Sequence, residues 1–175
     1  YKAIYYFNKS KNYKDNYIPN LWNLSLCQLR LGQFEQGFSL YEYRWSKKRQ
    51  STLFKKFTDL KTPKNLDEIK NKNILISDEQ GLGDAIQFSR FVIDLLKYTN
   101  KITFAVNSKL VKLLSNLHKD INILDYENIN LDKYDYHLSL CSLPKILELK
   151  KIDEINFYPI EIRNENNFKF ETKNK

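Results

Sequence analysis

The sequence predicts a mixed fold in which helical hairpins precede an α/β domain with a mainly parallel sheet. Two observations lead to this prediction. Residues near the N-terminus recur with a 34-residue period, and from residue 73 onward short β-rich runs alternate with runs of helical periodicity. Strands that alternate with helices are typical of βαβ units, whose strands lie parallel in one sheet. The expected divisions are 1–46, 47–72, 73–160 and 161–175.

The N-terminal division, 1–46, is expected to be a partial array of helical repeats. Three pairs of residues of similar character stand 34 positions apart: Ala3 and Gly37, Ile4 and Phe38, Phe7 and Tyr41. This spacing is the period of the tetratricopeptide repeat, in which two antiparallel helices pack closely where small residues meet. We expect helices at about 2–9, 17–30 and 34–46. One and a half repeats bury little core, so further repeats are expected before Tyr1.

Composition and residue spacing exclude several kinds of site. The chain has 175 residues and no methionine, and we expect it to be a fragment of a longer protein. Cys27 and Cys141 form no CxxC pair, and His118 and His137 form no HExxH motif, so neither a disulfide framework nor a metal site is expected. No apolar run reaches the roughly 18 residues of a transmembrane helix.

The second division, 47–72, is expected to be a basic connector. Residues 46–72 contain nine Lys or Arg and three acidic residues, a net charge of +6 out of +8 for the chain. Such a run can attract phosphate or an anionic membrane face, and its simplest interpretation is a solvated linker. We expect a cytoplasmic protein, with a peripheral position at the inner membrane face as an alternative. No nucleic-acid-binding motif is present, so no nucleic-acid partner is expected.

The third division, 73–160, carries the α/β pattern. Strands are expected at 73–77, 102–106, 121–124 and 136–140. Apolar residues at helical spacing predict helices over 85–96 and 110–117, and a further helix begins around Pro144. On the last strand Asp135, His137 and Ser139 share one face, and His137 is either a cleft residue or a satisfied polar residue at the edge. Trp22 and Trp45 are expected to pack helices.

The most informative motif is DEQGLGDAIQF at 78–88, between the first strand and its helix. In open α/β sheets, ligands bind beyond the carboxyl ends of the strands, and helix N-termini offer N–H groups to anions. A dinucleotide fingerprint is disfavoured because Ile86 stands where a small residue is needed, and a P-loop is excluded because no Gly-Lys-Ser/Thr follows. A purely structural alternative is a tight turn in which Asp84 caps the helix.

Three segments resemble one known family. Residues 79–84 (EQGLGD), followed by Ile86, Gln87 and Phe88, resemble the opening of the sugar-transferase domain that follows tetratricopeptide repeats in many bacterial proteins. That domain is similar to the lipopolysaccharide heptosyltransferases, which have the two-lobed, Rossmann-like GT-B fold. Residues 139–144 (SLCSLP) resemble the family's Ser-Leu-Pro segment, and 41–45 (YEYRW) the end of the last repeat. The likeness covers about residues 21–160.

The resemblance implies a function and a set of site residues. It implies that 73–160 is the acceptor-side lobe of a glycosyltransferase and that 161–175 begins the segment between lobes. Sugar would pass from a nucleotide-sugar, held mainly by a second lobe outside this chain, to a hydroxyl of a glycan or protein acceptor. No other cofactor and no metal are expected. Asp84 is the implied catalytic base, and the implied substrate-binding residues are Glu79, Gln80, Gly81, Gly83, Gln87, Ser139 and Ser142.

Two questions stay open from the sequence. Glu79 either orders its loop or contacts the acceptor. The whole chain is either part of an enzyme, inactive as a fragment, or a non-catalytic tetratricopeptide binding module with a degenerate α/β domain. In both cases the repeats can take a peptide partner.

Overall fold

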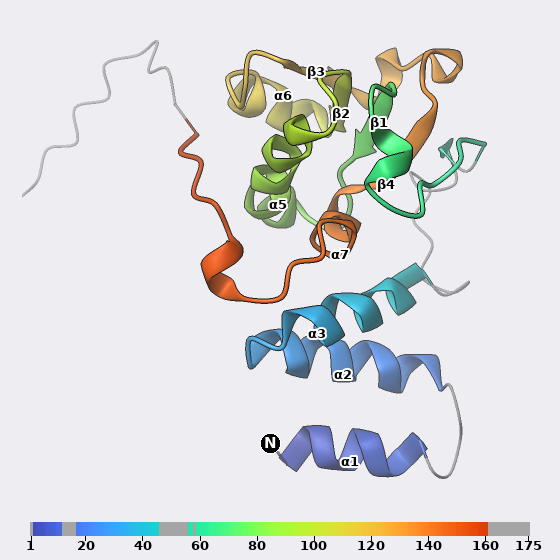
Figure 1. Cartoon of the computed structure of the whole chain (residues 1–175), viewed down its shortest axis with the longest axis vertical. Coiled ribbons are helices and arrows are strands. Elements are labelled where there is room, and N and C mark those ends of the chain that lie inside the picture. Colours follow the sequence, from blue (N-terminus) through green and yellow to red (C-terminus); the bar gives the residue numbers. More distant parts are fainter. Residues whose placement is uncertain (1, 12–16, 46–55, 58, 161–175) are drawn as a thin grey trace, which may run out of the picture.

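The structure is a computed structural model that describes residues 2–11, 17–45, 56–57 and 59–160. Three helices come first: α1 (Lys2–Lys11), α2 (Ile18–Arg30) and α3 (Phe34–Tyr41). A 3-10 helix, η1 (Glu42–Trp45), continues α3, so the α-helix expected over 34–46 tightens after Tyr41. Figure 1 shows these helices lying beside one another, below the sheet that follows. The expected tail at 161–175 lies outside the described residues, as does most of the first half of the connector.

The α2–α3 pair is held by close packing across a tight turn. Gly32 occupies the turn with φ of 74°, in the left-handed region that favours glycine. The Trp22 ring lies 4.7 Å from the Tyr41 ring, centroid to centroid. A Cβ at Gly37 would lie 2.7 Å from Leu29 Cδ2 and 3.1 Å from the Leu29 backbone nitrogen, so the two helices approach as closely as glycine allows.

The sheet has four parallel strands, which confirms the predicted mixture of helices with a parallel sheet. They are β1 (Ile74–Ser77), β2 (Ile102–Val106), β3 (Ile121–Asp125) and β4 (Tyr136–Ser139), in the spatial order β3-β2-β1-β4. The predicted strand at 136–140 ends one residue earlier, because Leu140 begins the 3-10 helix η6 (Leu140–Ser142).

The two faces of the sheet are covered differently. On one face, Ile74, Ile76, Phe104 and Leu138 belong to a core shared with helices α5 (Leu82–Asp94), α6 (Ser108–Leu114) and α7 (Leu143–Ile146). On the other face, Leu75 and Ala105 pack against Phe57 and partly buried residues of the segment that links β3 to β4. That segment contains only the short 3-10 helices η4 (Tyr126–Asn128) and η5 (Leu131–Lys133). The remaining 3-10 helices are η2 (Asp67–Ile69), η3 (Leu95–Lys97) and η7 (Ile152–Glu154).

Part of the predicted connector is integrated into the α/β core. The Phe57 side chain is fully buried, and Lys61 forms a parallel bridge with Tyr136. The His137 N–H donates to the Lys61 carbonyl at 2.9 Å, so this segment lies along the outer edge of β4. No helix of the described ranges is long and apolar enough to cross a membrane.

The strand order creates a switch point between β1 and β4. From β1 the chain proceeds to β2 and β3 on one side, and β4 then returns to the other side of β1. Ser77 pairs with Ser139 at the carboxyl ends of these two strands. In open α/β sheets, such a reversal of strand order leaves a crevice outside the carboxyl ends, where ligands bind.

The close approach at Gly37 gives the first prediction. Gly37→Ala should lower the free energy of unfolding by about 1–3 kcal/mol, because the new methyl group overlaps Leu29 and its backbone. Gly83→Ala is the matched control: a Cβ there meets nothing within 4 Å, and alanine favours helix by up to about 1 kcal/mol. Urea unfolding measures both. Equal stability of the two variants would contradict the packing described for α2 and α3.

Candidate functional site at the carboxyl ends of β1 and β4

A buried ion pair joins the helical segment to the loop after β1. Arg44, on η1, is 3% exposed, and Glu79, two residues after β1, is 8% exposed. Arg44 Nε donates to Glu79 Oε2 at 2.9 Å, and Nη2 donates to Oε1 at 2.7 Å. This two-point geometry is the strong, directional form of an arginine–carboxylate contact. It fixes the end of the helical segment against the loop of the EQGLGD motif.

The ion pair is the centre of a larger polar network. Arg44 also donates to Glu42 Oε1 and to Ser142 Oγ, each at 2.6 Å. The Ser142 hydroxyl is 3.0 Å from Glu42 Oε1, and the Cys141 N–H donates to Glu79 Oε1 at 3.0 Å. Burial opposes the charge of Arg44, but hydrogen bonds and attraction from Glu79 and Glu42 raise its pKa overall. Burial and the neighbouring Glu79 raise the pKa of the Cys141 thiol, so this cysteine is held protonated.

The rest of the motif lies on the surface. Gln80 has φ of 67° and is exposed, and Gly81 is the N-cap residue of α5. The half-buried Asp84 accepts a hydrogen bond from the Gly81 N–H through Oδ2 at 3.1 Å. The structure therefore contains the helix-capping contact considered for Asp84. Gly83 and Gln87 are both exposed on α5.

The candidate site residues fall into separate places. Glu79 is enclosed by the Arg44 network, whereas Gln80, Gly81, Gly83 and Asp84 lie at or near the surface around the start of α5. Gln87 lines a small hollow with Phe88 and Arg90, beside the helical segment. Ser139 and Ser142 line a different pocket, beside β4, which does not include Asp84 or Gln87.

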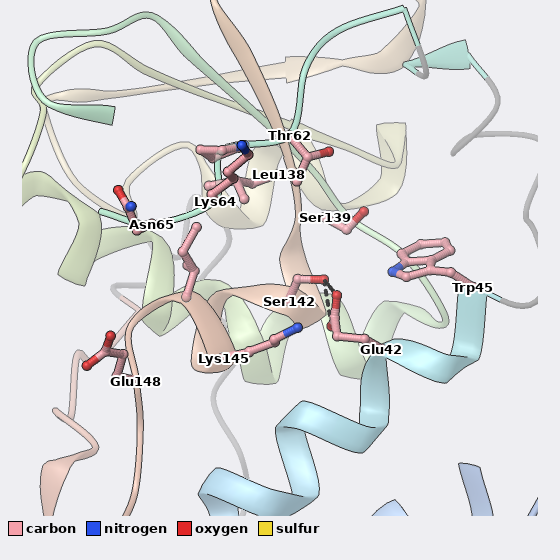
Figure 2. A pocket seen from close by; sticks show the side chains of 12 residues that line it. Glu42, Trp45, Thr62, Lys64, Asn65, Leu138, Ser139, Ser142, Lys145 and Glu148 are labelled. Carbon is pink, nitrogen blue, oxygen red and sulfur yellow. Dashed lines mark hydrogen bonds between the residues drawn. The ribbon is translucent and has the colours of Figure 1, made fainter. Parts of the chain in front are cut away.

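The pocket beside β4 contains residues that the sequence did not single out as a site. Its volume is about 650 Å³, and Figure 2 shows it from close by. Its lining comes from η1, the connector, β4 and α7 together with the residues around it: Glu42, Trp45, Thr62, Pro63, Lys64, Asn65, Leu138, Ser139, Ser142, Lys145, Ile146 and Glu148. The YEYRW run was the only sequence signal for Glu42 and Trp45. The sequence contained no signal for the connector residues, because they reach the pocket only through the pairing of Lys61 with β4.

Two buried titratable residues lie on or beside the sheet. His137 Nε2 is 2.8 Å from Ser77 Oγ, and its ring centroid lies 5.1 Å from that of Phe57. Burial lowers its pKa to about 4, so the imidazole is neutral. Among the two interpretations of His137, this geometry supports a satisfied structural residue. Asp78 accepts the Asn107 N–H at 3.0 Å, and burial raises its pKa to about 6.

The Arg44 network gives the second prediction. Glu79→Gln should lower the free energy of unfolding by about 3 kcal/mol, because breaking a buried ion pair costs about 3–5 kcal/mol. The loss lies at the lower end of this range, since Glu42 still pairs with the buried guanidinium. Asp67→Asn, which removes an exposed ion pair with Lys70, should change stability little. The double variant Arg44→Met, Glu79→Leu should recover part of the loss, since no buried charge remains. If urea unfolding gives Glu79→Gln the same free energy of unfolding as Asp67→Asn, the structural role of the Arg44–Glu79 pair is refuted.

Asp78 gives the third prediction, on pH. Its folded pKa of about 6 exceeds the ordinary 3.8, so its contribution to stability is complete below about pH 4 and is lost as pH rises through about 6. Asp78→Asn removes this loss, and asparagine can still accept the Asn107 N–H. Between pH 4 and 7 the free energy of unfolding of the variant should therefore rise relative to that of the wild type, by at most about 3 kcal/mol. The neutral His137 makes both proteins more stable as pH rises through this range. Because it is present in both, its effect cancels in the difference between them. A stability difference independent of pH would contradict the burial of a protonated Asp78.

Neither a cluster of metal-binding side chains nor a similarity to known proteins points to a particular ligand. Within the described ranges, no group of three or more His, Cys, Asp or Glu side chains could hold a metal ion. No family model, no curated protein and no solved structure matches this chain.

Proposed function

We propose that this chain supplies the acceptor-side lobe of a glycosyltransferase, which transfers sugar from a nucleotide-sugar to a hydroxyl acceptor. One observation carries the proposal. The EQGLGD motif, through which the chain resembles such enzymes, lies at the switch point between β1 and β4 of a parallel sheet. This is the place where open α/β sheets bind their ligands.

In this proposal Asp84 is the catalytic base. A hydroxyl that attacks a sugar must lose its proton as the new bond forms, and a carboxylate within hydrogen-bonding distance accepts it. Asp84 is half-buried in the first turn of α5, and the Gly81 N–H is its only hydrogen-bond donor among the described residues. A carboxylate has lone pairs for several such bonds, so capping the helix leaves it able to accept a further proton.

Glu79 takes a positioning role. Both of its carboxylate oxygens accept hydrogen bonds from Arg44, and Oε1 also accepts the Cys141 N–H. These contacts support the interpretation in which Glu79 orders its loop. In the proposal, the exposed Gly81, Gly83 and Gln87 face the acceptor instead.

The donor belongs to a second lobe. The nucleotide-sugar would be held mainly by a lobe outside this chain, as the family resemblance implies, so this chain alone should transfer no sugar. The competing function is a non-catalytic binding module, in which the helical segment recruits a protein and the sheet is only a scaffold.

The fourth prediction tests the role of Asp84 in the full-length protein. Asp84→Asn keeps an oxygen that can accept the Gly81 N–H, so the fold should be retained. Turnover should fall by about a hundredfold or more, because an amide cannot take the proton. Asp67→Asn, an exposed carboxylate on η2, is the control and should keep full activity. Activity is measured as release of nucleotide from nucleotide-sugars with candidate acceptors.

Two outcomes would count against the proposal. If Asp84→Asn keeps most of the wild-type turnover, Asp84 is only a helix cap. If the wild-type full-length protein transfers sugar to no acceptor, the binding-module function is favoured instead.

A further inference from the structure

The pocket beside β4 is built jointly by the helical segment and the α/β part. Figure 2 shows Thr62, Lys64 and Asn65 along one side and Ser142, Lys145 and Glu42 along the opposite side, with Trp45 at one end. The volume of about 650 Å³ lies in the range of small-ligand sites, which is about 300–1,000 Å³. The pocket therefore has room for a ligand of one or two sugar rings.

Ser139 gives the pocket a hydrogen-bonding group that the protein leaves unused. The residue is only 6% exposed, and it lines the pocket at the end of β4. Its hydroxyl forms no hydrogen bond with any part of the chain that the structure describes. The oxygen is not fully enclosed, so water or a ligand in the pocket can bond to it. A ligand hydroxyl in the pocket would be such a partner.

Trp45 provides a broad apolar surface at the end of the pocket. The Arg44 guanidinium lies over the indole, with Cζ 4.5 Å from the ring centroid. Because Arg44 is itself fixed by Glu79, this contact restrains the indole in place. The structure places Trp45 in the pocket wall, and the helix packing expected of it from the sequence stays a prediction. A fixed aromatic ring beside hydroxyl and carboxylate groups suits a ligand with one apolar face and polar edges.

The charges of the lining favour a ligand without net charge. Lys64 and Lys145 are balanced by Glu42 and Glu148. Glu42 is already engaged by Arg44 at 2.6 Å and by the Ser142 hydroxyl. A phosphate or another strongly charged group would thus meet both signs of charge, whereas neutral hydroxyls can bond to either.

We propose that this pocket binds one sugar ring of a neutral glycan. The apolar C–H face of the ring lies against Trp45, and a ring hydroxyl bonds to Ser139 Oγ. Glu42 and Trp45 make the helical segment a direct part of the sugar site. That this glycan is the acceptor rests on the function proposed above, whereas the binding itself does not.

Ligand-observed saturation-transfer NMR on the whole chain tests the binding. The probes are the methyl glycosides of glucose, galactose, mannose and N-acetylglucosamine, and inorganic phosphate, which has no C–H protons to observe, is added as a charged competitor. At least one glycoside should bind saturably. Ser139→Ala should weaken that binding about fivefold, the loss of one neutral hydrogen bond, and Trp45→Ala about tenfold or more. Trp22→Phe, whose ring packs on Tyr41 outside the pocket, is the control and should bind as the wild type does.

The outcomes separate the pocket from the enzyme. Binding of no glycoside, displacement of the bound glycoside by phosphate, or full affinity in both pocket variants would overturn the proposal. If Trp45→Ala fails to fold by circular dichroism, Ser139→Ala decides, since it removes only an unbonded hydroxyl. Asp84→Asn should bind the glycoside normally, because Asp84 does not line this pocket. If the full-length protein binds a glycoside but transfers no sugar, the glycosyltransferase function is contradicted, whereas the sugar-binding role of the pocket is supported.

Discussion

The buried pair of Arg44 and Glu79 is the contact on which the junction between the helices and the sheet depends. Removing two ions from water costs several kcal/mol each, and only good geometry with further hydrogen bonds offsets that cost. Here the guanidinium meets both carboxylate oxygens, the Cys141 N–H bonds to Glu79, and Glu42 and Ser142 satisfy further donors of Arg44. Hydrogen bonds of this kind are directional, so they set the position of η1 against the loop after β1.

The pocket beside β4 follows from this junction. Glu42 and Trp45 lie within two residues of Arg44 on η1, so fixing the arginine also places these two residues next to Ser139 and Ser142. The connector closes the opposite side, because Lys61 pairs with the edge of β4 and brings Thr62, Lys64 and Asn65 alongside. A ligand in the pocket would therefore contact both parts of the chain.

The EQGLGD motif makes contacts in the interior of the protein and also contributes residues to its surface. Its first residue, Glu79, faces inward and holds the helical segment, whereas Asp84 lies in the first turn of α5 and caps that helix. The turn between them changes direction at Gln80, where φ is positive, and at the extended Gly81. One short segment thus combines a structural contact with groups that face solvent at the switch point, and loops held by a rigid scaffold in this way often carry binding residues.

The sequence by itself determined the local elements and the parallel character of the sheet. Apolar periodicity reports which side of a helix or strand is buried, and this placed α2, β2 and the start of α3 within a residue or so. Tertiary structure alone decided which distant residues meet. Arg44 and Glu79 are 35 residues apart, and Glu42 and Ser142 are 100 apart. No local pattern records such pairings, since they depend on β4 lying beside β1 and on the docking of η1. For the same reason Phe57 and Trp45, ordinary aromatics in the sequence, acquire their places in the core and the pocket wall only in the folded chain.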